Sequence, residues 1–549
     1  GQMAALEDYF DVCEDEMKEK VLHLIVEKKI IIGPWYVLAD EFLVSGESLV
    51  RNLEVGMRLA GQYGESQKVG YLPDTFGHVS QMPQLLKGFG IDNSILWRGI
   101  KSETSEFTWE APNGSRVFTA FLPEGYYQPL LNEDNVEEQL KTYVGKVRPY
   151  ATTSHVLLTN GGDHLMPKHG NLMGQIDDIQ DEVEFVSSTY EEFLTKVQAE
   201  SSTDLPVYVG EMRSNEHIYV LPNVLSTRSY LKQQNQEMED ELAGYTEPLA
   251  SLCSKGKYPE RYLEESWKLL MQNHPHDSIC GCSIDEVHRE METRFEKVEK
   301  GALRYVTEQA REIASDISTT HHNPEAIPLI LFYTDGKPST QVIREKVMVQ
   351  KIYFDELDFR QIPGKLKSTP LPSFVLERGD GTTLPVHVKE KGISFGYDLP
   401  GDGFRKPYYA KEIEITFAIE SPIHIGYETC YLVPGENTPY EENLIWHQSE
   451  QKLENEHICV TIHENGSYSI LDKQTGYHYE SLGMYEDMGD IGNEYMFKAS
   501  SDGIVFTTKQ QTSTVNLVEN NPFRASIEIE SKISVPKQAD EQLELERQD

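Results

Sequence analysis

A short apolar run, Val69-Gly70-Tyr71-Leu72-Pro73-Asp74, ends in a carboxylate. It predicts a buried strand whose carboxyl end presents Asp74. An amphipathic pattern over residues 48–63 precedes this run and predicts a helix, and a second apolar run follows at residues 91–97. Further strands are expected at residues 30–33 and 155–159. Strands that alternate with helices of this length indicate a parallel α/β core.

Three zones with different patterns follow one another along the 549 residues. Residues 1–205 carry the α/β pattern and are expected to form a barrel-like parallel domain that lacks its first strand. Long helical periods predict a three-helix middle domain over residues 210–320. Short strands bounded by Gly, Pro and Asp predict a β-sandwich region over residues 325–549, incomplete at its C-terminus. Because Gly1 opens inside a helical pattern, we expect a fragment of a longer protein.

The composition indicates an acidic globular chain. Hydrophobic residues make up 38%, charged residues 26%, and the net charge is −40. Such a charge repels phosphate backbones and anionic lipid, so neither nucleic acid nor membrane is an expected partner. The six cysteines are scattered without a CxxC pair, and no export signal is visible, so we expect reduced thiols and a cytoplasmic location. The sequence leaves homo-oligomerisation open.

Two carboxylates are expected at strand ends. Asp74 is followed by the turn Thr75-Phe76-Gly77-His78, and Asp163 stands in Asn160-Gly161-Gly162-Asp163-His164. The carboxyl ends of strands carry the site in parallel α/β folds. The structural alternatives are a helix N-cap for Asp74 and an Asx turn for Asp163.

A third segment, Asn273-His274-Pro275-His276-Asp277-Ser278, follows a predicted helix. Two histidines and one aspartate within four residues suit metal binding or acid–base work, and the alternative is a capped helix end. Two carboxylates with a metal-competent His-Asp pair fit glycoside hydrolysis. They also fit a metallo-hydrolase that cleaves another bond.

Taken together and in this order, the three segments resemble those of the α-mannosidases of glycoside hydrolase family 38. The resemblance covers nearly the whole chain. It is also carried by residues 33–42, Trp97-Arg98-Gly99, residues 224–228, residues 276–281 and residues 487–495. The Asn-Gly-Gly-Asp-His wording is closest to the bacterial branch of the family.

The resemblance implies roles for individual residues. Asp74 matches the nucleophile, which is also a metal ligand, and His276 matches the histidine ligand of one zinc ion. Asp163 matches the general acid/base. Arg98 matches an arginine that holds the nucleophile, and Asp277 a carboxylate that holds sugar hydroxyls. Further residues expected in the sugar pocket are Trp35, Asp40 and Tyr126.

The implied reaction is retaining hydrolysis of terminal α-mannosidic linkages, in oligosaccharides or mannosyl conjugates, through a covalent mannosyl-enzyme. A retaining enzyme needs its two carboxyl groups about 5–5.5 Å apart. A zinc ion on the 2- and 3-hydroxyls would select the axial 2-hydroxyl of mannose. Arg98 would keep Asp74 ionised, whereas Asp163 must stay protonated.

The family takes two more metal ligands from a His-x-Asp segment, which we expect upstream of Gly1. Within the chain His23 lies on a predicted helix and His78 follows the nucleophile turn, so neither is a substitute. The chain alone is therefore expected to be inactive or nearly so. An inactive carbohydrate-binding remnant is one alternative. A different metal hydrolase, such as a deacetylase, is another, although the middle domain and the β-sandwich argue against it.

Overall fold

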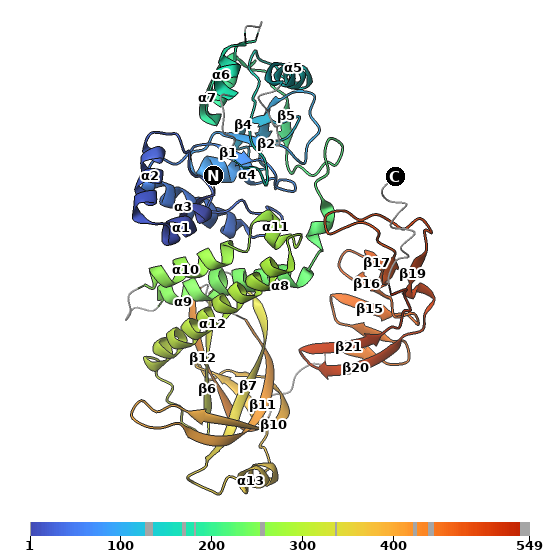
Figure 1. The fold of residues 1–549 in the computed structure, drawn as a ribbon. Helices are drawn as coiled ribbons and strands as arrows, with labels where there is room; N and C mark the ends of the chain where they lie inside the picture. Colours follow the sequence, from blue (N-terminus) through green and yellow to red (C-terminus); the bar gives the residue numbers. More distant parts are fainter. Residues whose placement is uncertain are drawn as a thin grey trace. The chain divides into compact units, whose positions relative to one another are not determined.

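The computed structural model describes residues 2–126, 135–166, 172–179, 183–252, 258–334, 338–420, 425–436 and 444–537. The chain divides into two compact units. The first unit comprises Gly1–Glu247, Lys257–Val306 and Gly492–Phe497, and the second comprises Pro248–Gly256, Thr307–Ile491 and Lys498–Asp549. Figure 1 shows helices around a small sheet in the first unit and mostly strands in the second.

The first unit contains a five-stranded sheet with the order β1-β2-β4-β3-β5. Its strands are β1 (Gly70–Leu72), β2 (Asn93–Leu96), β3 (Glu106–Glu110), β4 (Arg116–Phe121) and β5 (Val207–Val209). The pairs β1–β2, β2–β4 and β3–β5 are parallel, as expected, but β3 and β4 pair antiparallel. The sheet formed by the described strands is therefore open and mixed, instead of the parallel barrel-like sheet that the sequence predicted.

Two local features explain where the strand predictions differ. The β3–β4 hairpin turns at Gly114, whose φ of +83° suits glycine, and this local turn makes the antiparallel pair possible. No strand forms at residues 155–159, and at residues 30–33 only Ile32 makes an isolated bridge, to Ser66. A short apolar segment is not part of a β-sheet when no neighbouring strand forms backbone hydrogen bonds with it.

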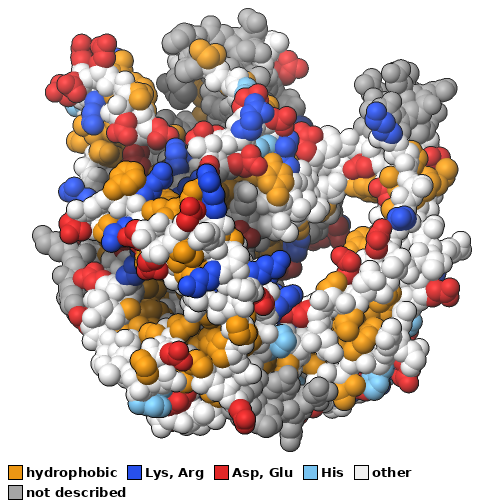
Figure 2. All heavy atoms as spheres, turned by 90° about the horizontal axis from the view of Figure 1, so that it is seen from below, with side chains coloured by type: hydrophobic (Ala, Val, Ile, Leu, Met, Phe, Trp, Pro, Cys, Tyr) orange, Lys and Arg blue, Asp and Glu red, His pale blue; other side chains and the backbone are white. Residues whose placement is uncertain are grey.

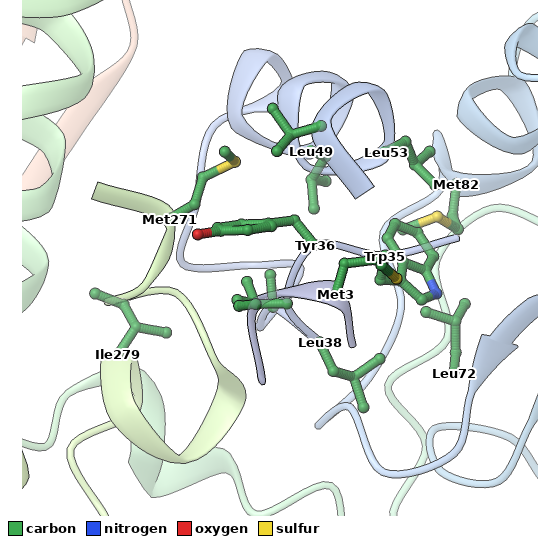
Figure 3. Close-up of a cluster of buried hydrophobic side chains, with 14 of the residues drawn as sticks. Met3, Trp35, Tyr36, Leu38, Leu49, Leu53, Leu72, Met82, Met271 and Ile279 are labelled. Carbon is green, nitrogen blue, oxygen red and sulfur yellow. The ribbon is translucent and has the colours of Figure 1, made fainter. Parts of the chain in front are cut away.

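Helices of the α/β part pack against three separate clusters of buried apolar residues. The helices are α1 (Met3–Val12), α2 (Asp15–Val26), α3 (Gly46–Tyr63), α4 (Met82–Gly88), α5 (Val136–Val147), α6 (Leu172–Asp177) and α7 (Tyr190–Glu200). The predicted helix at residues 48–63 is α3, which begins at the cap Ser45, whose side chain accepts the N–H of Ser48. Figure 3 shows Leu49 and Leu53 of this helix beside Tyr36, so its apolar face is packed against the segment that leads to the site.

Helical segments are present in the middle of the chain, where the sequence predicted a three-helix domain over residues 210–320. They are made of α8 (Ser229–Asp240), a π-helical turn (Glu241–Thr246), α9 (Glu247–Leu252), α10 (Glu260–Met271), the short α11 (His276–Ile279) and α12 (Asp285–Ser315). Met271 at the end of α10 and Ile279 of α11 belong to the same apolar core as Trp35 and Tyr36 (Figure 3). The segment that carries His276 is thereby packed on the α/β part.

The second unit begins with two sheets that share one apolar core. Their strands are β6 (Ile327–Tyr333), β7 (Thr340–Tyr353), β8 (Phe374–Arg378), β9 (Thr383–Leu384), β10 (His387–Asp398), β11 (Lys406–Glu420) and β12 (Gly426–Pro434), with α13 (Ile362–Ser368) inserted. The orders are β10-β11-β7 and β6-β12-β8-β9. Ile415 and Phe417 of one sheet and Leu376 and Leu432 of the other are fully buried in a common cluster, which is the packing of a β-sandwich.

The remaining strands form smaller sheets. They are β13 (Ile445–His447), β14 (Lys452–Glu454), β15 (Ile458–Ile462), β16 (Tyr468–Asp472), β17 (His478–Leu482), β18 (Glu486–Met488), β19 (Val505–Thr507), β20 (Thr514–Asn521) and β21 (Arg524–Glu530). The strands β13 to β17 make one five-stranded meander, and β18–β19 and β20–β21 are antiparallel pairs. The alternating Ile527–Glu530 segment lies in β21.

On the face drawn in Figure 2, acidic, basic and apolar side chains are interspersed. Of the six cysteines, the five that lie among the described residues are free. A search of the described helices finds none with the length and apolar character needed to cross a bilayer.

Candidate active site

Asp74 lies two residues beyond the end of β1, and Arg98 lies two residues beyond the end of β2. Because β1 and β2 are parallel neighbours, their carboxyl ends bring the two side chains together. Arg98 Nε donates a 2.7 Å hydrogen bond to Asp74 Oδ1. The sequence predicted this pair of residues, and the strand order explains why they meet.

Arg98 is held by further contacts besides its hydrogen bond to the carboxylate of Asp74. Its Nη1 donates to the carbonyl of Tyr219 at 2.7 Å. Its guanidinium carbon lies 4.2 Å from the ring centroid of Trp97 and 5.6 Å from that of Phe76. A guanidinium held by a carbonyl and two aromatic faces keeps one orientation, so it presents Nε to Asp74.

His276 reaches the same carboxylate from the start of α11. Its Nε2 lies 3.6 Å from Asp74 Oδ2 and 3.8 Å from Asp277 Oδ2. Its Nδ1 lies 3.1 Å from the carbonyl of Leu38, which favours a proton on Nδ1, so Nε2 is the atom that gains or loses the second proton of the ring. The ring of Phe76 packs edge-on against the imidazole, with 5.2 Å between centroids.

The charges around Asp74 decide its protonation. Burial raises the pKa of Asp74, but the contact with His276 and the charge of Arg98 outweigh burial, and the pKa lies below its ordinary value. For His276, burial lowers the pKa, and Asp74 and Asp277 together raise it further than burial lowers it. An ionised Asp74 is the form that a nucleophile or a metal ligand requires.

Tyr126 connects the two candidate catalytic carboxylates. Its hydroxyl oxygen lies 3.1 Å from Asp74 Oδ2 and 2.7 Å from Asp163 Oδ2, so these two oxygens are at most 5.8 Å apart. Burial and both carboxylates raise the pKa of Tyr126, so the phenol keeps its single proton. Asp163 itself is exposed and lies in a loop.

Asp277 borders this group. Its side chain is 52% exposed, and its Oδ1 lies 3.5 Å from the thiol of Cys282. The ring of Tyr495 lies 6.4 Å from that of Phe76. A half-exposed carboxylate beside His276 is available to accept sugar hydroxyls.

Two of the expected pocket residues are placed elsewhere. Trp35 is 4% exposed, its Nε1 donates to the carbonyl of Tyr71 at 3.0 Å, and it lies among the core side chains in Figure 3. Asp40 is 1% exposed, and its carboxylate accepts from the N–H groups of Phe42 and Leu43. These contacts bury both side chains behind the site.

The sequence interpretation did not single out Glu41, Tyr219 or Tyr495. Glu41 lies within residues 33–42 and Tyr495 within residues 487–495. Both segments carried the resemblance to the family, but neither residue was given a role. Tyr219 contributes only its carbonyl, and no side-chain pattern could have indicated it.

The donor set at Asp74 and His276 suits a metal ion. Two ligand atoms on one tetrahedral zinc stand about 3.4 Å apart, close to the 3.6 Å between Asp74 Oδ2 and His276 Nε2. The Leu38 carbonyl on Nδ1 is the outer contact that ligating histidines generally make. These two residues therefore fit the expected ion.

A second cluster of ligand-type side chains lies in the second unit. Among the described residues, His321, His322 and Glu377 place their ligand atoms within 4.8 Å of one another. His321 Nδ1 accepts the N–H of Asn323 at 3.1 Å, so a neutral ring carries its proton on Nε2, 3.4 Å from Glu377 Oε1. The two imidazole rings stack at 4.1 Å. His321 Nε2 is buried and makes no hydrogen bond to a described residue, so its contact with Glu377 is a charge contact only.

Comparison with known proteins bears on the whole chain. The model of the glycosyl hydrolases family 38 N-terminal domain matches residues 1–211, and the α-mannosidase middle domain matches residues 221–313. Two C-terminal domain models of the same family match residues 324–434 and 453–546. The chain belongs to glycoside hydrolase family 38.

Relatives and solved structures of family 38 agree with this assignment. A Halalkalibacterium halodurans protein named "Putative mannosylglycerate hydrolase" is 43% identical over 573 residues, covering 100% of this chain and 64% of its own length. Human Alpha-mannosidase 2C1 is 30% identical over 49% of this chain and 26% of its own. The crystal structure of an alpha-mannosidase from Enterococcus faecalis V583 matches with a TM-score of 0.91 and 35% identity, over 100% of this chain and 63% of that one. The chain thus spans less than two thirds of the length of these relatives.

Proposed function

We propose that this family 38 protein hydrolyses terminal α-mannosidic bonds with net retention of configuration. The observation that carries the proposal is the shared contact of Asp74 and Asp163 with the Tyr126 hydroxyl, which limits their oxygens to 5.8 Å. Inverting enzymes keep their carboxyl groups about 6.5–9.5 Å apart to admit a water, whereas retaining enzymes need about 5–5.5 Å. The spacing supports attack by one carboxylate while the other protonates the leaving oxygen.

Asp74 is the proposed nucleophile. The hydrogen bond and the charge of Arg98 keep it ionised, and its burial removes water that would compete for the anomeric carbon. Its attack breaks the glycosidic bond and forms a mannosyl ester on Asp74. Arg98 stays bonded to Oδ1, which leaves Oδ2 for the attack or for a metal ion.

Asp163 is the proposed acid/base. It gives its proton to the leaving oxygen in the first step and takes one from water in the second. Tyr126 has one proton and two carboxylate neighbours. It donates to whichever carboxylate carries the negative charge, so it can follow the charge from Asp74 to Asp163 as the ester forms.

Zinc is the proposed cofactor, with Asp74 Oδ2 and His276 Nε2 among its ligands. When bound, the ion supplies a Lewis acid for two adjacent sugar hydroxyls. Asp277, half-exposed beside His276, is proposed to accept hydrogen bonds from the same sugar. The name of the Halalkalibacterium relative makes an α-mannoside of a small hydroxy acid, such as mannosylglycerate, the first natural substrate to test.

Proton NMR of the first-formed sugar tests the proposal. The full-length protein is mixed with nitrophenyl α-mannoside and, separately, with mannosylglycerate, and the anomeric signal is followed before mutarotation. Retention predicts that α-mannose appears first. Initial release of β-mannose would contradict the mechanism, and binding without any turnover would favour the carbohydrate-binding alternative.

A further inference from the structure

Asp40 and Glu41 are consecutive acidic residues, and both are buried, with 1% and 2% of their surface exposed. They lie in the irregular segment before α3. Burying a carboxylate costs free energy unless its oxygens are hydrogen-bonded, and apolar residues would fill the same volume without that cost. The contacts of each carboxylate show what compensates this cost.

Asp40 contacts the segment that carries His276. Its Oδ2 accepts from the thiol of Cys280 at 3.3 Å, and its own N–H donates to the carbonyl of His274 at 3.1 Å. Its Oδ1 accepts the N–H groups of Phe42 and Leu43, which fixes the carboxylate's orientation.

The same segment is tied down on both sides of Asp40. Ala39 and Pro275 form an isolated antiparallel bridge. The carbonyl of Leu38 accepts the N–H of His276 at 3.1 Å and lies 3.1 Å from its Nδ1. Residues 38–40 therefore hold both the backbone and the ring of His276.

Glu41 contacts the segment that carries Asp74. Its Oε1 lies 2.7 Å from His78 Nδ1, and its Oε2 accepts the N–H of Val79 at 2.9 Å. His78 is fully buried, and its Nδ1 also lies 3.3 Å from the hydroxyl of Thr75, the residue after Asp74. This chain of contacts fixes both ends of the turn that presents Asp74.

We propose that Asp40 and Glu41 are positioning residues that together set Asp74 against His276. One residue holds the histidine segment and its neighbour holds the nucleophile turn. Because a single peptide bond joins them, the two segments cannot shift apart without breaking buried hydrogen bonds. The 3.6 Å separation of Asp74 Oδ2 and His276 Nε2 is the quantity that they fix.

The inference rests on the proposed function for its catalytic consequence, but its geometric content does not depend on activity. The variants are Asp40→Asn and Glu41→Gln, which preserve shape and remove the charge. Glu106→Gln is the matched control. Glu106 is 1% exposed in the same unit, and its carboxylate accepts from the N–H and hydroxyl of Thr152.

Four quantities are measured on each variant of the protein: the zinc dissociation constant by chelator competition, kcat and KM for nitrophenyl α-mannoside, and the Tm. Asp40→Asn and Glu41→Gln are expected to weaken zinc and lower kcat, each by about 10- to 100-fold, as removal of supporting contacts around a metal ligand generally does. Glu106→Gln is expected to lower the Tm about as much as the other two variants do. Its zinc affinity and kcat are expected to stay within about twofold of those of the unaltered protein. Loss of Tm alone in all three variants would overturn the proposal, because the carboxylates would then serve stability only.

Crystal structures of the variants give a readout that needs neither zinc nor turnover. The Asp74–His276 separation should widen or become variable in Asp40→Asn and Glu41→Gln, and an unchanged separation in both would overturn the proposal. Cys280→Ala, which removes one contact of Asp40 at small cost in volume, serves if either variant fails to fold, and it should widen the same separation to a smaller degree. Absence of turnover in the full-length, unaltered protein would instead refute the proposed function.

Discussion

The two catalytic carboxylates of the proposed site are held in different ways. Asp74 follows a strand of the sheet, its side chain is 17% exposed, and Arg98, His276 and Tyr126 surround it. Asp163 is exposed in a loop and meets the others through the hydroxyl of Tyr126. The comparison indicates that the nucleophile side is preorganised by buried contacts, whereas the acid/base side depends on a loop that can adapt to the leaving group.

The largest effect on activity is expected at Asp74, on the nucleophile side. Asp74→Ala should lower kcat by about 10⁴- to 10⁶-fold, the range seen when a catalytic nucleophile is removed. It should also weaken zinc binding, because the same carboxylate is a proposed ligand. Turnover of nitrophenyl α-mannoside and chelator competition measure the two effects. Unchanged zinc affinity in Asp74→Ala would contradict the role of Asp74 as a zinc ligand and leave only its role as nucleophile.

Asp163→Ala should have an effect that depends on the leaving group. Loss of the general acid is expected to cost about 10²- to 10⁴-fold on mannosylglycerate or another alkyl mannoside. The cost in the first step should be much smaller on nitrophenyl α-mannoside, whose leaving group needs little protonation. Zinc affinity should not change. Asp204→Ala, which removes another exposed loop carboxylate, is the control and should leave both rates unaltered.

Tyr126→Phe probes the connection between the two sides. Loss of a hydrogen bond to a charged group is worth about 1.5–3 kcal/mol, so a drop in kcat of about 10- to 100-fold is expected. The fall should be similar for good and poor leaving groups, because the hydroxyl contacts both carboxylates. Tyr143→Phe removes a hydroxyl that donates to the carbonyl of Leu157 and is the matched control. A leaving-group dependence like that of Asp163→Ala would place Tyr126 with the acid/base alone.

The smallest effect on activity is expected at Trp35. Trp35→Phe removes the hydrogen bond to the Tyr71 carbonyl inside the core and should lower the free energy of unfolding by about 1 kcal/mol. KM should stay within about twofold, since the side chain is buried behind the site. Denaturant unfolding and steady-state kinetics measure the two. A large rise in KM with unchanged stability would instead support the expectation that Trp35 contacts the sugar.

Sequence reasoning succeeded where the signal was local. The apolar run before Asp74 predicted β1, and the helical periods predicted α3, α8, α10 and α12. It did not predict the β3–β4 hairpin, although Asn113-Gly114 is a turn signal, because the parallel α/β pattern favoured a crossover.

The limits of the sequence are clearest at the site. Asp74 and His276 are 202 residues apart in the sequence, and only the resemblance to family 38 joined them before the structure did. Within the 33–42 segment, periodicity could not tell which polar side chains face the sugar and which are buried. Asp40 and Glu41 have their partners at Cys280 and His78, in segments that the local sequence does not bring together.

Trapping the covalent intermediate tests the assignment of the nucleophile most directly. The protein is incubated with a 2-deoxy-2-fluoro or 5-fluoro mannosyl fluoride, which slows hydrolysis of the ester more than its formation, and the labelled peptide is identified by mass spectrometry. The proposed mechanism predicts one fluoromannosyl group per chain, on the peptide that contains Asp74, and no label in Asp74→Ala. A label on Asp163, or stoichiometric label in Asp74→Ala, would contradict it.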